Sequence, residues 1–306
     1  MAKSEHTFKT EDNINIVYYK HTAEKPKANV IIVHGMAEHA QRYDSFADFL
    51  TENGFNVYAY DQRGHGKTAG NIDKQGFFAD KNGWRKVTAD LKKMIETVKT
   101  DSSDLPLFLL GHSMGTFVTR TYIADYEDSV KGVILSGTTG SAGLLGKIGI
   151  VLTSIIMLFK KKDSPSPLMD SLSFGDFNKA FKPNRTKFDW LSRDEKQVDK
   201  YVNDPYCGAV FSVGFYNDMM KGLEYVNKPE TVNKVRKDLP VYLFAGDKDP
   251  VSKNGKQVKD VFEMYKNAGI KDISMKLYEG ARHETLNETN RNEVYNDILS
   301  WLNSRL

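Results

Sequence analysis

Ser113 lies in the pentapeptide Gly111-His112-Ser113-Met114-Gly115, which fits the pattern GxSxG. An apolar run, Leu107 to Leu110, precedes it, and a run typical of a helix, Thr116 to Tyr126, follows it. A serine at such a sharp turn from a strand into a helix has its hydroxyl exposed for attack on a substrate. The flanking glycines are expected because a side chain there would collide with the neighbouring strand or helix. We therefore expect Ser113 to be a nucleophile.

A serine hydroxyl needs a base that removes its proton and an acid that holds the base in the right tautomer. In proteins with this turn, both partners follow the serine in the chain, the acid before the histidine. His283 is the one histidine after residue 112, and it follows an apolar strand predicted over Ile273 to Tyr278. The preceding acidic loop contains Asp247 and Asp249. We favour Asp249, because the proline after it restricts it to an extended conformation that directs its carboxylate across the loop; Asp247 is the alternative.

The elements that must position these residues alternate between strands and helices along the first 137 residues. Strands are predicted at Ile14 to Tyr19, Val30 to Val33, Phe55 to Tyr60, Leu107 to Leu110 and Gly132 to Ser136, and helices near Tyr43 to Asn53, at Gly83 to Lys99 and at Thr116 to Tyr126. Such alternation predicts an α/β fold with a mostly parallel central sheet and helices on both faces. Each candidate residue then stands at the end of a core strand.

The alternation stops at about residue 138 and resumes only at Leu239 to Ala245. A structureless loop of that length inside a compact domain is improbable. We therefore expect three parts: a first core segment over residues 1–137, an inserted and mainly helical cap or lid over residues 138–238, and a second core segment over residues 239–306.

The expected cap contains an apolar stretch, Leu144 to Phe159, in which Lys147 is the single charged residue and which Lys160, Lys161 and Lys162 follow. Since a membrane-spanning helix needs about 20 apolar residues, this stretch is too short to cross a bilayer. Transient contact of Leu144 to Lys162 with a membrane surface is one interpretation. The other is a cap helix packed over the active site. Aromatic and methionine residues further on are expected to form mostly the cap's own core, with some lining a tunnel for an acyl chain: Phe174, Phe177, Phe181, Phe188, Trp190, Phe211, Phe215, Tyr216, Met219 and Met220.

Two further histidine motifs follow predicted strands. The segment His34 to His39 has the sequence HGMAEH, and a His-Gly turn of this kind offers backbone N–H groups for an oxyanion. We expect Glu38 and His39 to have structural hydrogen-bonding roles. His65 lies in the loop DQRGHG and is likewise interpreted as structural.

Composition narrows the function classes. The chain has 306 residues and a net charge of +3, which does not indicate a nucleic-acid partner. Its single cysteine, Cys207, excludes an internal disulfide, and no cluster with metal-ligand spacing is present, so neither a metal nor an organic cofactor is expected. The amino terminus is polar and lacks the apolar segment of a signal peptide. These features favour a cytoplasmic protein, peripheral at the membrane if the apolar stretch contacts lipid.

Taken in order, the motifs VHGMAEH, YDQRGHG, GHSMG, GDKDPV and YEGARHE resemble those of the α/β-hydrolase superfamily, and within it the monoacylglycerol lipase and lysophospholipase-like serine hydrolases. The resemblance covers about residues 10 to 137 and 238 to 306; the insert matches only in position and general character. It implies the α/β-hydrolase fold and an acid at the end of a GxxD loop, which is Asp249 here. It also implies an oxyanion hole formed by the N–H groups of Met36 and Met114.

The expected activity is hydrolysis of a carboxylic ester through an acyl-enzyme, with Ser113 as nucleophile, His283 as base and Asp249 as its orienting acid. The expected substrate is a single-chain lipid ester of the monoacylglycerol type, because the apolar insert suits one acyl chain. A lysophospholipase, a general carboxylesterase and a thioesterase use the same residues and stay open. A binding protein of this fold without catalysis is disfavoured by the complete set of Ser, Asp and His.

Overall fold

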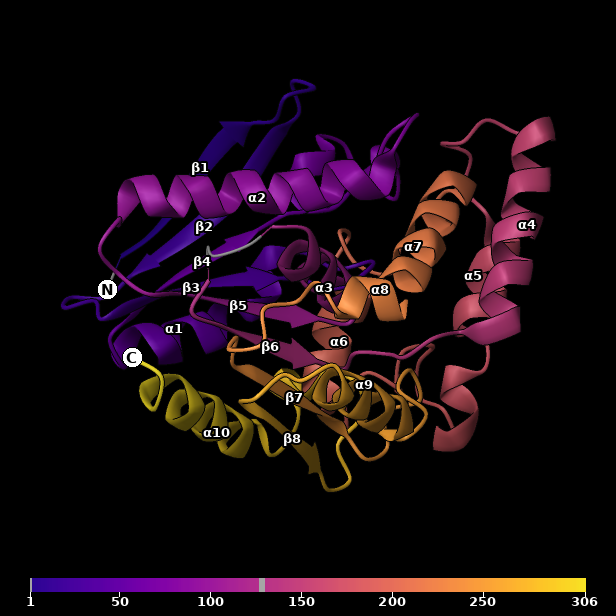
Figure 1. Cartoon of the computed structure of the whole chain (residues 1–306). Helices are drawn as coiled ribbons and strands as arrows, with labels where there is room; N and C mark the ends of the chain where they lie inside the picture. Colours follow the sequence, from indigo (N-terminus) through magenta and orange to yellow (C-terminus); the bar gives the residue numbers. More distant parts are fainter. Residues whose placement is uncertain (1, 127–129) are drawn as a thin grey trace.

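The computed structural model describes residues 2–126 and 130–306. Its strands form one sheet in the order β1-β2-β4-β3-β5-β6-β7-β8 (Figure 1). The strands are Ala2–Lys9 (β1), Asn15–Thr22 (β2), Ala28–Val33 (β3), Phe55–Tyr60 (β4), Leu107–His112 (β5), Gly132–Ser136 (β6), Val241–Gly246 (β7) and Ile273–Tyr278 (β8). Strands β3 to β8 run parallel, whereas β2 pairs antiparallel with β1 and β4. The predicted mostly parallel sheet is confirmed.

Helices cover both faces of this sheet. They are Asp44–Glu52 (α1), Gly83–Asp101 (α2), Met114–Asp125 (α3), Gly143–Phe159 (α4), Pro167–Phe174 (α5), Glu195–Asn203 (α6), Val213–Val226 (α7), Pro229–Val232 (α8), Lys256–Asn267 (α9) and Arg291–Asn303 (α10). Alternate residues of the buried strands face opposite helical layers, as the pleat of a strand requires. Ile31 packs in the cluster with α2, α3 and α9, whereas its neighbour Ile32 packs in the cluster with α1 and α10. This double burial explains why the strands are apolar without interruption.

Strand β1 is absent from the sequence prediction, which described the amino terminus only as polar. Its residues pair with β2 from Ala2 opposite Thr22 to Lys9 opposite Asn15, at the edge of the sheet. Most of its side chains are exposed. The strand is therefore held by backbone hydrogen bonds to β2 and carries no apolar pattern that could predict it.

Helices α4 to α8 lie between β6 and β7 in the chain, and Figure 1 shows α4 and α5 outermost, beyond the arrowheads of β5 and β6. Helix α7 packs between α4 and the core. Its Phe215 and Tyr216 belong to the same buried cluster as α2 and α3. On its other side, Asn217 donates from Nδ2 to Thr153 Oγ1 of α4 at 2.8 Å. The carboxyl-terminal part of the segment between β6 and β7 thus shares the main core.

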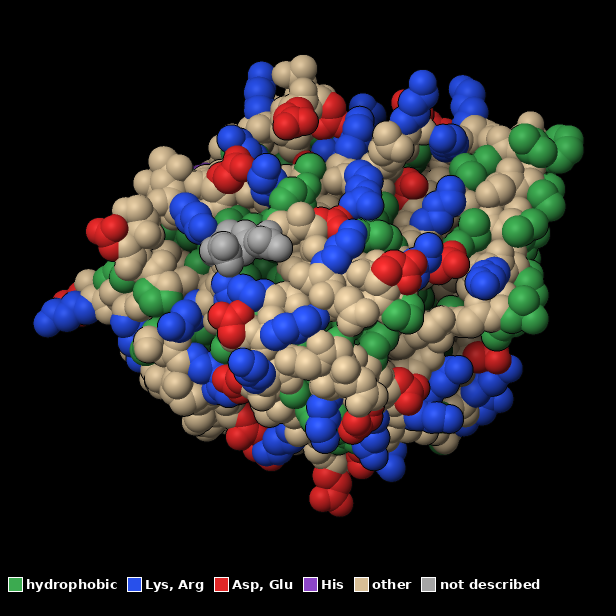
Figure 2. Space-filling view, in the orientation of Figure 1, with side chains coloured by type: hydrophobic (Ala, Val, Ile, Leu, Met, Phe, Trp, Pro, Cys, Tyr) green, Lys and Arg blue, Asp and Glu red, His purple; other side chains and the backbone are tan. Residues whose placement is uncertain are grey.

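Helix α4 leaves most of its apolar residues exposed. Thr153 is its one buried residue. Leu145, Leu158 and Phe159 are 77%, 78% and 84% exposed. The green surface at the right edge of Figure 2 lies over α4. Among the described residues, no helix has both the length and the apolar character to cross a membrane.

Candidate active site

Ser113 stands at the turn between β5 and α3, with φ +51° and ψ −122°. This region is strained for a residue with a side chain, and surrounding contacts must hold it there. One such contact is the Ser113 N–H, which donates to Ser136 O at 2.9 Å. A Cβ on Gly115 would lie 2.0 Å from Val33 O, and one on Gly111 would lie 2.7 Å from Gly115 O. The expected need for glycine at both positions is confirmed.

The structure brings His283 and Asp249 together from the loops after β8 and β7. His283 Nδ1 lies 3.0 Å from Asp249 Oδ1, and both side chains are buried. Oδ1 also accepts a hydrogen bond from the Val251 N–H at 2.9 Å. Asp247 is directed elsewhere, because its Oδ1 accepts from the Gly280 N–H at 2.8 Å and so closes the turn after β8. Of the two acids that sequence nominates, the structure places Asp249 against the imidazole.

Ser113 and His283 line the same cavity, of ≈ 100 Å³, together with Gly35 and Met36. In the part of the chain that the structure describes, no hydrogen bond joins the two side chains. Such contacts are often long in an unliganded enzyme and shorten when substrate binds. The serine, the histidine and the His-Gly turn therefore border one space.

Burial and neighbouring charges act in opposite directions on His283. Burial lowers its pKa, but the Asp249 carboxylate, with smaller contributions from Glu284 and Glu38, raises that pKa above the ordinary 6.5 in total. A base with a raised pKa accepts the proton of a serine hydroxyl more readily, and its imidazolium form is stabilised next to the acid. The electrostatics suit a general base.

Three other buried histidines are held neutral. Burial lowers the pKa of His34 and of His65 to about 3 and that of His112 to about 4. His65 Nδ1 lies 3.1 Å from Arg63 O, and its ring packs edge-on against Phe211. The structural interpretation of His65 is confirmed. His112 packs against His283 with ring centroids 4.8 Å apart and so fixes one side of that imidazole.

The His-Gly turn after β3 lies directly against the serine. A Cβ on Gly35 would be 3.1 Å from Ser113 Cβ, and the Gly35 N–H donates to Glu38 Oε1 at 2.6 Å. Apart from the regular hydrogen bonds within helices and strands, the backbone N–H groups of Met36 and Met114 donate to no backbone carbonyl of a described residue. Free N–H groups on either side of a nucleophile are what an oxyanion hole requires.

Arg42 joins the His-Gly turn to the histidine loop. It donates to Glu38 Oε2 at 2.8 Å and, through two bonds of 2.6 and 2.7 Å, to Glu284, the residue after His283. All three side chains are buried. Sequence reasoning interpreted Glu38 as structural but missed Arg42 and Glu284. The partners are 242 residues apart, and no local pattern indicates the contact.

The segment between β6 and β7 also holds both loops. The N–H groups of His283 and Glu284 donate to Trp190 O at 3.4 Å and to Leu191 O at 2.8 Å, and the Trp190 ring lies 5.4 Å from the imidazole. On the opposite side, Ala37 O accepts from Tyr201 Oη at 2.9 Å and from Gly208 N at 3.0 Å. Residues 188–208 therefore form part of the frame of the site.

The aromatic residues expected to form the core of the cap divide into two groups. Trp190 packs with Phe174, Phe177, Phe181 and Phe188 in a small separate cluster. Phe174, Phe188 and Trp190 also line the cavity over Ser113. The others belong to the main core or pack against it: Phe211, Phe215, Tyr216, Met219 and Met220.

One cluster among the described residues has metal-ligand chemistry. His39, Asp204 and Cys207 offer ligand atoms within 4.8 Å of one another. His39 Nε2 and Asp204 Oδ2 already lie in hydrogen-bonding contact at 2.8 Å. Burial raises the pKa of the Cys207 thiol, which disfavours the thiolate that a metal needs. The expectation that the protein uses no metal stays a prediction.

Comparison with known proteins places these features in a family. A model of the family described as "Serine aminopeptidase, S33" matches residues 24–290. The chain is 27% identical to a monoacylglycerol lipase of Mycolicibacterium smegmatis over 100% of this chain and 99% of the relative. It is 28% identical to a monoglyceride lipase of Rattus norvegicus over 92% and 84% of the two chains. The solved structure of a carboxyl esterase of Bacillus coagulans in complex with glycerol is 29% identical in sequence and superposes with a TM-score of 0.92. The match covers 100% of this chain and 99% of the esterase.

Proposed function

The chain belongs to the serine aminopeptidase S33 family of α/β-hydrolases, and from that premise we propose that it is a serine hydrolase of single-chain lipid esters of the monoacylglycerol type. The observation that carries the chemistry is the buried Asp249–His283 pair, 3.0 Å apart, in which His283 lines the same cavity as the strained Ser113. No chemical step in this proposal requires a metal or an organic cofactor.

The proposed reaction has two halves. Ser113 Oγ attacks the ester carbonyl while His283 takes its proton, and Asp249 holds the imidazole so that its free nitrogen faces the serine. The N–H groups of Met36 and Met114 stabilise the oxyanion that develops. His283 then protonates the departing alcohol, and water repeats the sequence on the acyl-enzyme to release a fatty acid.

The lining of the cavity favours a neutral head group. Its described walls contain the carboxylates of Glu38, Asp170 and Glu284 but no lysine or arginine. Glu38 and Glu284 are already paired with Arg42, so no cation of the described lining is left to bind a phosphate, whereas the hydroxyls of glycerol need none. This contrast supports a monoacylglycerol over a lysophospholipid as the preferred substrate.

The chemistry is tested with Ser113→Ala. The variant should fold as the parent does, lose turnover of a short-chain p-nitrophenyl ester and lose labelling by a fluorophosphonate. Retention of substantial activity would refute the mechanism.

The substrate is tested separately, with monoacylglycerol and lysophosphatidylcholine of equal chain length, the matching thioester and p-nitrophenyl ester. We expect the highest kcat/KM on monoacylglycerol. Faster turnover of the lysophospholipid would refute the head-group argument while leaving the mechanism intact.

Residues 138–238 are proposed to act as a cap whose α4 contacts lipid. The support is the outward apolar face of α4, followed by Lys160, Lys161 and Lys162, since such an arrangement suits a membrane surface with anionic head groups. With Cys207 as its single cysteine, the chain is proposed to be a cytoplasmic enzyme that is peripheral at the membrane.

The lipid contact is tested with Leu145→Ser together with Leu158→Ser, two positions whose exposure makes a folding defect small. The double variant should lose activity on aggregated lipid and keep it on a water-soluble short ester. An equal loss on both substrates would contradict the lipid contact.

A further inference from the structure

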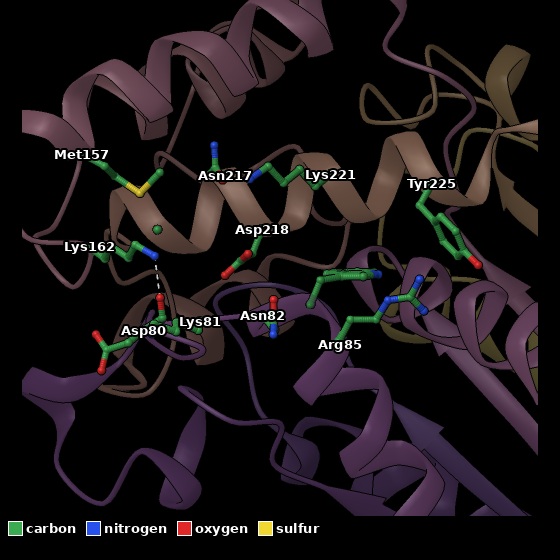
Figure 3. A pocket seen from close by; sticks show the side chains of 12 residues that line it. Asp80, Lys81, Asn82, Arg85, Met157, Lys162, Asn217, Asp218, Lys221 and Tyr225 are labelled. Carbon is green, nitrogen blue, oxygen red and sulfur yellow. Dashed lines mark hydrogen bonds between the residues drawn. The ribbon is translucent and has the colours of Figure 1, made fainter. Parts of the chain in front are cut away.

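A second cavity, of ≈ 500 Å³, is lined in part by α7 and is larger than the space over the serine. It is bordered by the start of α2, by α7 and by the turn after α4, and its lining residues are shown in Figure 3. None of the residues that line it also lines the cavity over Ser113. The proposed hydrolysis does not use it.

The walls of this cavity are fixed by specific contacts. Lys162 Nζ donates to Asp80 O at 2.5 Å and ties the end of α4 to the segment before α2. The Gly214 N–H donates to Lys162 O at 2.9 Å and ties the same turn to α7. Trp84 packs so closely on α7 that a Cβ on Gly222 would lie 2.1 Å from its ring. The cavity is therefore a formed feature of three packed segments.

Basic side chains dominate the lining. Lys81 and Arg85 come from the α2 side, Lys162 from the turn after α4, and Lys221 from α7. Arg85 is already paired with Asp125. Within the described chain, none of the three lysines has a carboxylate within ion-pair distance. Three cations without an ionic partner around one hollow attract an anion.

Asp218 is an acid of the same lining, and Lys221 and Lys162 act on it electrostatically. It projects from α7 toward the first residue of α2, where a Cβ on Gly83 would lie 2.2 Å from its Oδ2. Burial raises its pKa to about 6, against the opposing effect of Lys221 and Lys162. The other charged or titratable groups of the lining are Asp80 and Lys81 from the segment before α2, Arg85 from α2 and Tyr225 from α7. Below about pH 6, a proton on Asp218 would remove one negative charge that an entering anion meets; Asp80 is the other acid of the lining.

The position of the cavity identifies the kind of anion. Met157 of α4 lines it, and the next two residues of that helix, Leu158 and Phe159, are the most exposed apolar side chains of the chain's described part. Figure 2 shows basic side chains next to the apolar surface of α4. A ligand would therefore place its charged group in this cavity, and its apolar portion, or the neighbouring molecules of a lipid layer, would contact α4.

We propose that this cavity binds the phosphodiester head group of an anionic phospholipid when α4 lies on a lipid surface, with Lys162 and Lys221 as its principal cations. The inference rests on the lipid contact proposed for α4 and adds a head-group preference to it. Bound at this site, the lipid would hold the enzyme with α4 against the surface and leave the cavity over Ser113 free for substrate.

The experiment measures binding to vesicles of phosphatidylcholine alone and of phosphatidylcholine mixed with phosphatidylglycerol, a phosphodiester whose charge is constant between pH 5 and 8. The intact protein should prefer the mixed vesicles, and its affinity for them should rise as the pH falls toward 6, because protonated Asp218 no longer repels the head group. Lys162→Gln with Lys221→Gln should lower that affinity about 25-fold, or about fivefold for each lysine, and remove the pH dependence.

Two control variants separate the cavity from general electrostatic attraction. Lys160→Gln with Lys161→Gln removes the same charge from exposed positions outside the cavity, and it should weaken binding but keep the pH dependence. Asp218→Asn should keep the preference for phosphatidylglycerol and lose the pH dependence. Unchanged pH dependence in Asp218→Asn, or an equal preference for the two vesicles in the intact protein, would overturn the head-group site.

Two further outcomes are diagnostic. If the intact protein binds neither vesicle, the lipid contact of α4 fails and the head-group site fails with it, whereas hydrolysis of soluble esters is unaffected. If soluble glycerophosphoglycerol binds as tightly as the mixed vesicles, the ligand is a soluble phosphodiester and the assignment to a lipid is wrong.

Discussion

Replacing Arg42 with methionine removes the cation that lies between two buried carboxylates, Glu38 and Glu284. Removing one member of a buried ion pair costs about 3 to 5 kcal/mol, because the remaining charge loses its compensation. The entropy of unfolding is about 2.1 cal/mol/K per residue, or about 0.64 kcal/mol/K for 306 residues. The melting temperature of Arg42→Met should therefore fall by about 5 to 8 °C.

The assay is thermal denaturation at neutral pH, with two matched variants. Arg42→Lys keeps the charge but not the two parallel bonds to Glu284, so it should lose less than Arg42→Met. Arg42→Met combined with Glu284→Gln removes one of the uncompensated carboxylates and should recover part of the lost melting temperature. A melting temperature of Arg42→Met within about 1 °C of the parent, or a double variant no more stable than the single one, would refute the reasoning.

Three other outcomes follow from the geometry of the site and the cavity. Gly115→Ala should lose activity and about 3 kcal/mol or more of the free energy of unfolding, because its Cβ would lie 2.0 Å from Val33 O; a normal denaturant midpoint would contradict this. Glu284→Gln should shift the acid limb of the pH profile of kcat/KM to lower pH, since the Glu284 carboxylate raises the pKa of His283 and the base must be neutral to act; a limb that stays in place or rises argues against this charge effect. Asp218→Asn should raise the free energy of unfolding by about 1 to 3 kcal/mol above pH 6 and leave it unchanged near pH 4. The folded-state pKa of Asp218, about 6, lies above the ordinary 3.8, so ionisation of Asp218 costs stability as the pH rises between these values. Thermal denaturation at both pH values is the measurement, and equal effects at the two would contradict this prediction.

The core of the fold could be predicted because its strands carry their own signal. Phe55–Tyr60, Gly132–Ser136 and Ile273–Tyr278 have the predicted bounds. The first two are buried throughout, whereas Ile273–Tyr278 is mostly half-buried at the edge of the sheet and also contains Ser274 and Lys276. Strands buried on both faces must be apolar throughout, and turn residues end them sharply. The edge strand Ala2–Lys9 is polar and exposed, so that only its pairing with β2 identifies it.

The candidate residues Ser113, Asp249 and His283 could be nominated for a related reason. Each follows a predicted strand, and the carboxyl ends of parallel strands meet at one edge of a sheet. Local sequence contains no such information about the contact of Arg42 with Glu284, 242 residues away, or of Trp190 with the His283 loop. Their contribution depends on how residues 138–238 and the loops after β3 and β8 are arranged in the fold.

The hydrogen bonds from residues 188–208 to Ala37, His283 and Glu284 have a consequence for protein engineering. A chimera that exchanges the whole segment 138–238 for that of a relative would remove the supports of the histidine loop together with the apolar surface. An exchange limited to residues 143–187 would replace α4 and α5 and leave those supports in place. The first chimera should lose hydrolysis of every ester, whereas the second should keep it on soluble esters and acquire the donor's response to lipid aggregates.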